Sequence, residues 1–349
     1  SRLRMEQACD GEAFPTAGGK SNATITAACE ANARQGKVFL VTGATSGIGR
    51  EVSQHLQAAG ASKIYGGCRP GPEAVGRLAP GVLPFHCDLS SLSSVQAAAR
   101  EFIARGAAQE VYCLVLNAGI QVPSLHVVSF SEEARDAAEA CGVELTMHTN
   151  HLGHFLLANL LLPHMQPAEL RVVVVSSDAH KMPRDHRRFS LHNRWTAENW
   201  HPLLAYGESK LANVLFTSDL QRRGRTGLLA VSVHPGIVPQ TGLARHVLAK
   251  SEPREGWTVP TKTVPQAAAS ILFCALAPAA QLRGGAYYAD CAEAQTSKLA
   301  RRAELAAKLW EQSEQTCGLT GILAPRIMPK PDAGMAHASA QAVDDEDAA

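Results

Sequence analysis

The sequence has almost no net charge, few aromatic residues and no long hydrophobic run. Its 33 lysines and arginines are balanced by 32 aspartates and glutamates, which leaves a formal charge of +1. This balance gives no reason to expect nucleic acid or an anionic membrane surface as a partner. Aromatic residues make up only 5% of the chain, so the core has to be largely aliphatic. The longest apolar stretches, 156–162 and 271–277, are too short to cross a bilayer, and we expect no transmembrane segment.

The nine cysteines are an odd number and include no C-x-x-C pair, and no signal-peptide pattern precedes them. Reduced thiols in a reducing compartment explain them best, which favours a cytoplasmic protein. Residues 1–35 are rich in Ala, Gly, Ser and Thr without a sustained period, so we expect a flexible extension with a short helix near 26–34. A remnant of a segment that targets a plastid or another organelle stays open as a second interpretation of this extension.

Between residues 36 and 322, short apolar runs alternate with helical segments. Seven strands are expected, at Val38–Val41, Ser62–Cys68, Val82–Cys87, Val111–Leu116, Leu170–Ser176, Leu228–His234 and Ala286–Ala289. The longest helices are expected at 143–165 and 206–223. This alternation predicts a single α/β domain with a doubly wound parallel sheet, a Rossmann fold. Residues 323–349 contain prolines and end in an acidic run, which predicts a disordered tail.

The first predicted strand leads into a glycine-rich turn and then into a helix. The glycines Gly43, Gly47 and Gly49 are spaced G-x-x-x-G-x-G, not G-x-G-x-x-G as in the commoner dinucleotide fingerprint. Such a turn lets backbone N–H groups and a helix N-terminus approach a pyrophosphate without obstruction by side chains. We therefore expect this turn, including Ser46 and Ile48, to bind a dinucleotide.

Tyr206 and Lys210 lie four residues apart in Tyr206-Gly-Glu-Ser-Lys210, at the beginning of a predicted helix. Residues four apart share one face of a helix, so both side chains should point the same way. A lysine cation lowers the pKa of a neighbouring phenol from about 10. Tyr206 would then be able to exchange a proton near neutral pH. Taken alone, the pattern is much more typical of a packed tyrosine beside a solvated lysine.

Several further motifs occur with this pair in one order along the chain. They are the glycine turn, Asn117-Ala-Gly119, Asn150, Ser176-Ser177, Tyr206 with Lys210, and Pro235-Gly236. In this order the chain resembles the short-chain dehydrogenase/reductase superfamily over about residues 37–319. Three stretches, Asn150-His-Leu-Gly-His-Phe-Leu157, Tyr206-Gly-Glu-Ser-Lys-Leu-Ala-Asn-Val-Leu215 and Val233-His-Pro-Gly236, are similar to its retinol-dehydrogenase-like branch, which includes the WW-domain oxidoreductases.

The resemblance implies a catalytic group of Asn150, Ser177, Tyr206 and Lys210, with Ser176 as the alternative to Ser177. It also implies cofactor contacts beyond the glycine turn, at Asp88, Leu89, Asn117, Ala118, Gly119, Tyr206, Lys210, Pro235 and Gly236. The chain departs from the family pattern four residues after Pro-Gly, where Gln240 replaces a threonine that contacts the nicotinamide. Thr241, one residue later, is the alternative contact.

The end of the second predicted strand, Gly66-Gly-Cys-Arg69, bears on the choice of cofactor. An NAD site usually has a carboxylate at this position, which accepts hydrogen bonds from the ribose hydroxyls. Here there is none, and Arg69 could pair with a 2′-phosphate. We therefore expect NADP(H), although a solvated loop arginine explains Arg69 as well.

Histidines recur every three residues at His148, His151 and His154, and others are frequent between 180 and 201. We expect no metal site, because solvated or hydrogen-bonded histidines explain the first group and arginines surround the second.

The sequence thus predicts an NADP(H)-dependent oxidoreductase that interconverts a carbonyl and an alcohol. The loop 237–263 is expected to cover the site and contributes Leu243, Val247, Leu248 and Trp257, which favours a lipophilic small-molecule substrate. Two alternatives stay open: an enzyme like protochlorophyllide reductase, disfavoured by Ala212 where that family has cysteine, and a non-catalytic NADP(H)-sensing protein. A homo-oligomer is compatible with the sequence, which does not specify the oligomeric state.

Overall fold

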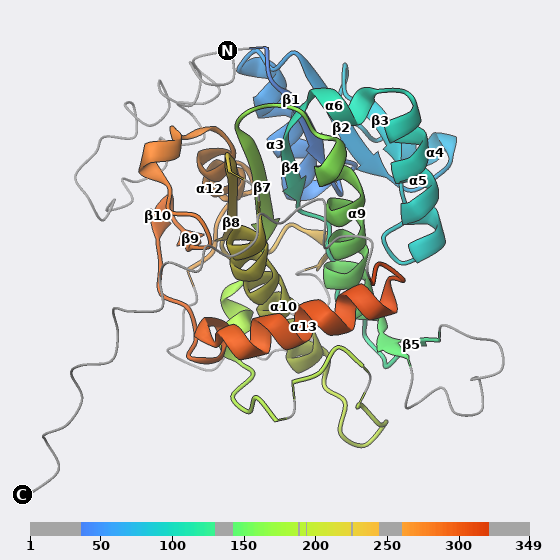
Figure 1. Cartoon of the computed structure of the whole chain (residues 1–349), viewed down its shortest axis with the longest axis vertical. Coiled ribbons are helices and arrows are strands. Elements are labelled where there is room, and N and C mark those ends of the chain that lie inside the picture. The colour runs from blue at the N-terminus through green and yellow to red at the C-terminus, as the bar shows by residue number, and fades with distance from the viewer. Residues whose placement is uncertain are drawn as a thin grey trace, which may run out of the picture.

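The computed structural model describes residues 36–129, 142–187, 189–192, 194–224, 226–243 and 260–320. The extensions expected at 1–35 and 323–349, the short helix near 26–34 and most of the loop 237–263 lie outside these residues. The described residues form a single domain with one large sheet and helices on both of its faces (Figure 1). The expected Rossmann fold is confirmed.

The large sheet has eight strands in the order β10-β9-β8-β7-β4-β1-β2-β3. Their bounds are β1 Val38–Val41, β2 Lys63–Cys68, β3 Leu83–His86, β4 Val111–Leu116, β7 Leu170–Val175, β8 Leu228–His234, β9 Tyr287–Ala289 and β10 Ala292–Glu293. All neighbours pair in parallel except β9 and β10. β9 lies within the strand predicted at Ala286–Ala289, whereas β10 and its antiparallel pairing are not predicted by the sequence pattern. The strand order reverses between β1 and β4, where open α/β sheets bind their ligands.

Two helices, α3 (Gly47–Ala58) and α12 (Val264–Leu276), cover one face of the sheet, and three cover the other: α5 (Leu92–Ala104), α9 (Gly153–Leu161) and α10 (Pro202–Arg223). The helix α13 (Ala303–Thr316) packs on α10 from outside (Figure 1). Short helical segments complete this face and the connections: α4 Pro72–Val75, α6 Ala107–Glu110, α8 Leu145–Met147, η2 Leu162–His164, η3 Asp178–Lys181, η4 Ala279–Gln281 and η5 Leu299–Arg301. A separate two-stranded sheet joins β5 (Val127–Val128) to β6 (Val143–Glu144).

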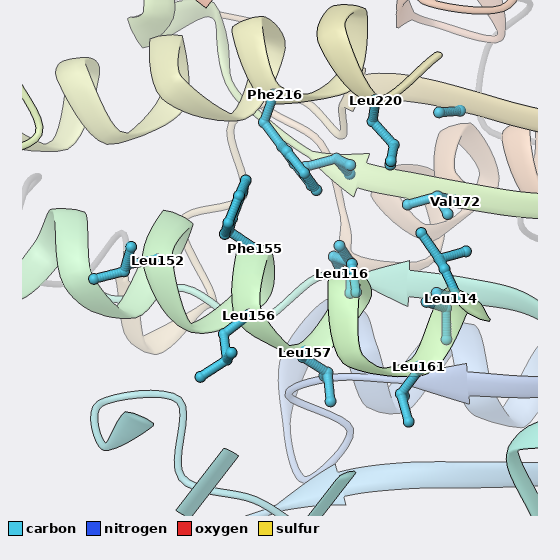
Figure 2. Packing of buried hydrophobic residues seen from close by; sticks show 14 of the residues in the cluster. Leu114, Leu116, Leu152, Phe155, Leu156, Leu157, Leu161, Val172, Phe216 and Leu220 are labelled. Atoms are coloured by element: carbon cyan, nitrogen blue, oxygen red, sulfur yellow. The ribbon is translucent and has the colours of Figure 1, made fainter. Parts of the chain in front are cut away.

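The core consists of two aliphatic clusters, one on each face of the sheet. Alternate residues of β1 show the division, because Leu40 belongs to the cluster under α9 and α10 whereas Phe39 belongs to the cluster under α3 and α12. Figure 2 shows the first cluster, where side chains of β4 and β7 face those of α9 and α10. Phe155 and Phe216 lie 5.5 Å apart between ring centroids and add a small aromatic group to it.

The helix expected at 143–165 is interrupted, and its predicted beginning is wrong. Val143 pairs with Val128 in β6, the next residues form α8, and a π-helical turn, η1 (His148–Leu152), precedes α9. At Gly153 the chain lies against the Leu89 carbonyl oxygen, with which a Cβ would collide. A π turn inserts one extra residue into a helix and is frequent at functional sites, and here it contains Asn150. Among the described residues, no helix has both the length and the apolar character needed to span a membrane.

Candidate functional site

The predicted site residues come together beyond the carboxyl ends of β1, β4, β7 and β8. The glycine turn follows β1, with positive φ at Gly43 (67°) and Gly47 (52°), a backbone conformation that favours glycine. A Cβ at Gly49 would collide with the Gly43 carbonyl and lie 2.5 Å from Asn117 Nδ2. Ser46 makes no side-chain capping hydrogen bond to α3. The first N–H groups of this helix thus have no capping side chain, as a phosphate-binding helix N-terminus requires.

Thr42, the last residue before the turn, ties the ends of β1 and β4 together. Its Oγ1 accepts hydrogen bonds from the N–H groups of Asn117 (2.9 Å) and Ala118 (3.0 Å). Asn117 returns a bond from Nδ2 to the Thr42 carbonyl at 2.9 Å. A Cβ at Gly119 would lie 3.4 Å from Lys210 Nζ. The Asn-Ala-Gly segment therefore links the glycine turn to the predicted catalytic lysine.

The side chain of Asn150 is fully buried and its amide is occupied by structural hydrogen bonds. Oδ1 accepts from Ile120 N at 2.7 Å, and Nδ2 donates to Ile120 O at 2.9 Å and to Ser209 Oγ at 3.0 Å. Asn150 thus joins the loop after β4 to α10. Its backbone carbonyl accepts from His154 Nδ1 at 3.0 Å.

The two adjacent serines have different surroundings. Ser176 is buried, and its Oγ donates to the Lys210 carbonyl at 2.8 Å, so it holds β7 against α10. Ser177 is half-buried, accepts from Ala179 N at 3.2 Å and makes a side-chain hydrogen bond with Tyr206. Of the two, the geometry brings Ser177 to the tyrosine.

Tyr206 and Lys210 share one face of α10, as the spacing predicts. Lys210 Nζ lies 5.4 Å from the centroid of the Tyr206 ring and donates to the Val175 carbonyl at 3.1 Å. Burial lowers the pKa of Lys210 to about 8. Burial also raises the pKa of Tyr206 to about 12, and its hydrogen bond with Ser177 acts in the opposite direction.

The expected lowering of the tyrosine pKa by Lys210 is therefore not what this structure has. Burial disfavours the charged forms of both groups, and for Tyr206 this outweighs its neighbours. The spacing of two residues along a helix predicts on which face their side chains lie. The pKa of a phenol depends instead on how completely the ring is removed from water.

The residues predicted to hold the adenosine end lie at the ends of β2 and β3. Arg69 is exposed, and no described carboxylate pairs with it. A Cβ at Gly67 would lie 2.9 Å from Thr42 Cα, so glycine permits the close packing of β1 and β2. Asp88 Oδ1 accepts from Ser90 N (2.9 Å) and Ser90 Oγ (2.6 Å), which fixes the carboxylate beside Leu89.

Pro235 and Gly236 end β8 at the same edge of the sheet. Gly236 has φ +97°, and a Cβ there would lie 2.5 Å from Lys262 Cδ. The Thr241 hydroxyl donates to the Val238 carbonyl at 2.9 Å, while its methyl group lies 3.5 Å from where a Cβ at Gly47 would be. The adjacent Gln240 is exposed. Thr241 thus lies beside the glycine turn.

The three histidines of the π turn and α9 are buried rather than solvated, and each has its own partner. His148 bonds to the Leu89 backbone, His151 Nε2 lies 2.9 Å from Ser313 Oγ, and His154 Nε2 lies 2.8 Å from Thr42 Oγ1. Across the described part of the chain, no three His, Cys, Asp or Glu residues are grouped to hold a metal ion.

His154 and a second buried histidine, His180, belong to the surroundings of the site although sequence analysis gave neither a role there. The only signal for His154 is its position four residues after Asn150, which places both on one side of the helix. His180 follows Ser177 by three residues, within a short helix that the sequence pattern does not reveal.

Comparison with known proteins agrees with this arrangement. The profile of the short chain dehydrogenase family matches residues 37–189. Human retinol dehydrogenase 11 is 36% identical over 302 residues, which cover 82% of this chain and 86% of that protein. The WW domain-containing oxidoreductase of Gallus gallus is 34% identical over 84% of this chain and 71% of that protein. The crystal structure of an uncharacterized protein from Mycobacterium paratuberculosis has a TM-score of 0.60 and 31% identity, covering 81% and 93% of the two chains.

Proposed function

The chain belongs to the short-chain dehydrogenase/reductase family, in its retinol-dehydrogenase-like branch, and from this premise we propose that it is an NADP(H)-dependent oxidoreductase acting on lipophilic carbonyls and alcohols. The observation that carries the proposal is the meeting of Ser177, Tyr206 and Lys210 at the edge of the sheet that also holds the glycine turn. Each of these polar side chains is the type that the reduction of a carbonyl requires.

The glycine turn fits a dinucleotide, because a side chain at Gly49 would fill the space under the turn and the first N–H groups of α3 have no capping side chain. Gly43, Ser46, Gly47, Ile48 and Gly49 would hold the pyrophosphate. The remaining contacts would come from Asp88 and Leu89, Asn117 to Gly119, Tyr206, Lys210, Pro235 and Gly236. When bound, the nicotinamide would supply or accept the hydride.

The chain's own residues would manage the proton. Tyr206 would donate a proton to the substrate oxygen during reduction and take it back during oxidation. Ser177 would donate a hydrogen bond to the same oxygen and stabilise the charge that develops there. Lys210, with its pKa lowered to about 8, would hold the nicotinamide ribose and restore the proton of Tyr206. Asn150, whose amide bonds to Ile120 and Ser209, would hold the loop after β4 against α10, the helix that carries Tyr206 and Lys210.

The charge of Arg69 supports NADP(H) over NAD(H). The end of β2 carries no carboxylate, and the exposed guanidinium is available for a 2′-phosphate. Arg50, by contrast, is engaged through Nε with the Arg77 carbonyl at 3.1 Å.

Two exposed apolar side chains support a lipophilic substrate. Ile237, which is 38% exposed, follows Gly236, and Met182, which is 39% exposed, lies beside Gly207, the residue after Tyr206. Exposed large aliphatic side chains at a site favour an apolar ligand. The relative from human is named a retinol dehydrogenase, and a retinoid is one such ligand.

The test is an NADPH-consumption screen over aldehydes, ketones and retinoids, with Tyr206→Phe as the matched inactive control. Turnover of one class by the parent alone supports the proposal. NADPH binding without turnover of any class would instead favour an NADP(H)-sensing protein, and light-dependent turnover of protochlorophyllide would favour that related enzyme.

A further inference from the structure

His180 fixes the backbone that carries Ser177. Its ring is 0% exposed, and Nδ1 lies 2.7 Å from the Ser177 carbonyl oxygen. Since a carbonyl oxygen only accepts, Nδ1 carries the proton and donates it. The N–H of Ser297 donates to Nε2 at 3.2 Å, so Nε2 is an acceptor. Both ring nitrogens are used, and together they select one neutral tautomer.

The ring is enclosed by a third segment of the chain. Its centroid lies 4.7 Å from that of Tyr287 in β9, and the Tyr287 hydroxyl donates to Asp178 Oδ1 at 2.9 Å. Asp178 also pairs with Lys181 at 2.8 Å. β9 and the segment before η5 thus surround η3, the short helix that begins directly after Ser177.

The same short helix is pressed against α10 next to Tyr206. A Cβ at Gly207 would lie 2.7 Å from the Ala179 carbonyl oxygen, so glycine allows this close approach. Ser176, the residue before Ser177, is held by its hydrogen bond to the Lys210 carbonyl, as described above. On the other side of Ser177 the chain continues into η3. The His180 side chain connects η3 to the Ser177 carbonyl oxygen and to the N–H of Ser297.

We propose that His180 is a positioning residue, which holds Ser177 through its carbonyl oxygen so that the serine hydroxyl stays at Tyr206. The inference rests on the proposed function, because His180 acts on the reaction only through Ser177. A histidine that served stability alone would make the same contacts, so the test has to separate the two roles.

Three substitutions of His180 separate them. In His180→Phe both hydrogen bonds are lost; in His180→Asn the amide N–H can replace Nδ1; in His180→Gln the amide lies nearer the position of Nε2. With NADPH and 4-nitrobenzaldehyde or all-trans-retinal as probes, we expect kcat of His180→Phe to fall about tenfold or more, because small displacements of reacting groups are costly. NADPH affinity should stay unchanged, and His180→Asn should recover most of kcat whereas His180→Gln should not. His55→Phe is the matched control, since His55 is buried on α3 and its Nδ1 lies 3.0 Å from a backbone carbonyl; its kcat should equal the parent's.

A double-mutant cycle with Ser177→Ala gives the decisive comparison. If His180 acts through Ser177, His180→Phe should lower kcat by less than about twofold in the Ser177→Ala background. Additive losses, equal recovery by His180→Gln, or an unchanged kcat in His180→Phe would overturn the inference while leaving the proposed function standing. An unchanged kcat in Ser177→Ala alone would remove Ser177 from the mechanism, and the inference with it.

Crystal structures of the variants supply a readout besides activity. The Ser177–Tyr206 hydrogen bond should be lost in His180→Phe and kept in His180→Asn. Its retention in both variants would contradict the proposal.

Discussion

The hydroxyl of Thr42 donates a hydrogen bond to Nε2 of His154 across 2.8 Å, joining the end of β1 to α9. The direction follows from the other ring nitrogen, because Nδ1 must donate to the Asn150 carbonyl oxygen at 3.0 Å. Burial lowers the pKa of His154 to about 4, so the ring is neutral and Nε2 has a lone pair. Thr42 Oγ1 therefore donates once to the histidine and accepts from two backbone N–H groups.

Replacement of Thr42 by valine should destabilise the protein and weaken NADPH binding. The change leaves the N–H group of Ala118 and Nε2 of His154 without their partner, whereas the N–H group of Asn117 keeps the Val115 carbonyl at 3.1 Å. Each unsatisfied buried polar group costs about 1–3 kcal/mol. Urea unfolding measures the first effect and fluorescence titration with NADPH the second. Thr42→Ser keeps the hydroxyl and should stay close to the parent; equal losses in both variants would contradict the role of the hydroxyl.

Tyr206→Phe should abolish turnover and leave NADPH affinity nearly intact, because the ring stays and only the proton donor is lost. The measurement is kcat for the best substrate of the screen together with the dissociation constant for NADPH. Residual activity within about tenfold of the parent would exclude Tyr206 as the general acid.

Lys210→Ala should impair both turnover and cofactor binding. It removes the ammonium group 5.4 Å from the Tyr206 ring and the proposed ribose contact. Lys210→Arg keeps a cation but has a wider head group, and serves as the control for charge. An unchanged NADPH affinity in Lys210→Ala would show that the ribose contact is wrong, whatever happens to turnover.

Arg69→Asp should reverse the choice of cofactor. A guanidinium–phosphate pair contributes about 1.5–3 kcal/mol, and about 1.4 kcal/mol corresponds to tenfold in affinity. We expect the parent to prefer NADPH by at least about tenfold, and the variant to lose this preference. The ratio of kcat/KM for the two cofactors, at fixed ionic strength, measures it. Arg77→Asp is the control for a change of charge nearby; a parent that prefers NADH, or a ratio unchanged in Arg69→Asp, would refute the assignment.

Acid should destabilise the fold through its buried histidines. Burial lowers the pKa of His151 from 6.5 to about 3, so below pH 6.5 the unfolded chain binds a proton that the folded chain does not. Stability from this residue is therefore complete above its unfolded pKa and declines as pH falls toward about 3. Glu208, with its pKa raised to about 7, contributes in the opposite direction.

The comparison of parent with His151→Gln isolates the histidine, because the Glu208 contribution is common to both. Urea unfolding from about pH 7 to about pH 5 should show a smaller loss of stability in the variant than in the parent. Parallel pH profiles would contradict the buried neutral state of His151.

The fold could be read from the sequence where local pattern decides structure. The strands β1, β4 and β8 have the predicted bounds, because each is a largely apolar run that polar residues or a proline end, such as Asn117 or Pro235. The segment 143–165 was not readable in the same way. Its apolar pattern suits one long helix, whereas the pairing of Val143 with Val128 and the contact of Gly153 with Leu89 are set by distant parts of the chain.

In the site, too, local sequence pattern predicts some features, whereas burial and distant contacts determine others. The helical spacing placed Tyr206 and Lys210 on one face, but the pKa of Tyr206 depends on burial, which no spacing reports. His154 also bonds to Thr42, which is 112 positions away along the chain, and His180 to Ser297, which is 117 positions away. These distant contacts could not be inferred from the local sequence pattern. The roles proposed for Ser177, Lys210 and Arg69 stay predictions, which the experiments above test.

The position of α13 has a consequence for how the protein is made. Its Trp310 lies 5.0 Å from Phe155 and 5.9 Å from Phe216 between ring centroids, so it completes the aromatic group on the outer side of α9 and α10. α10 ends at Arg223 and α13 begins at Ala303, so these helices are synthesised about eighty residues or more before α13, a distance along the chain that a ribosome covers in several seconds. Until residues 303–316 have emerged, the helix that carries Tyr206 and Lys210 has an uncovered aromatic surface. A chain that stops short of α13 would keep this surface exposed.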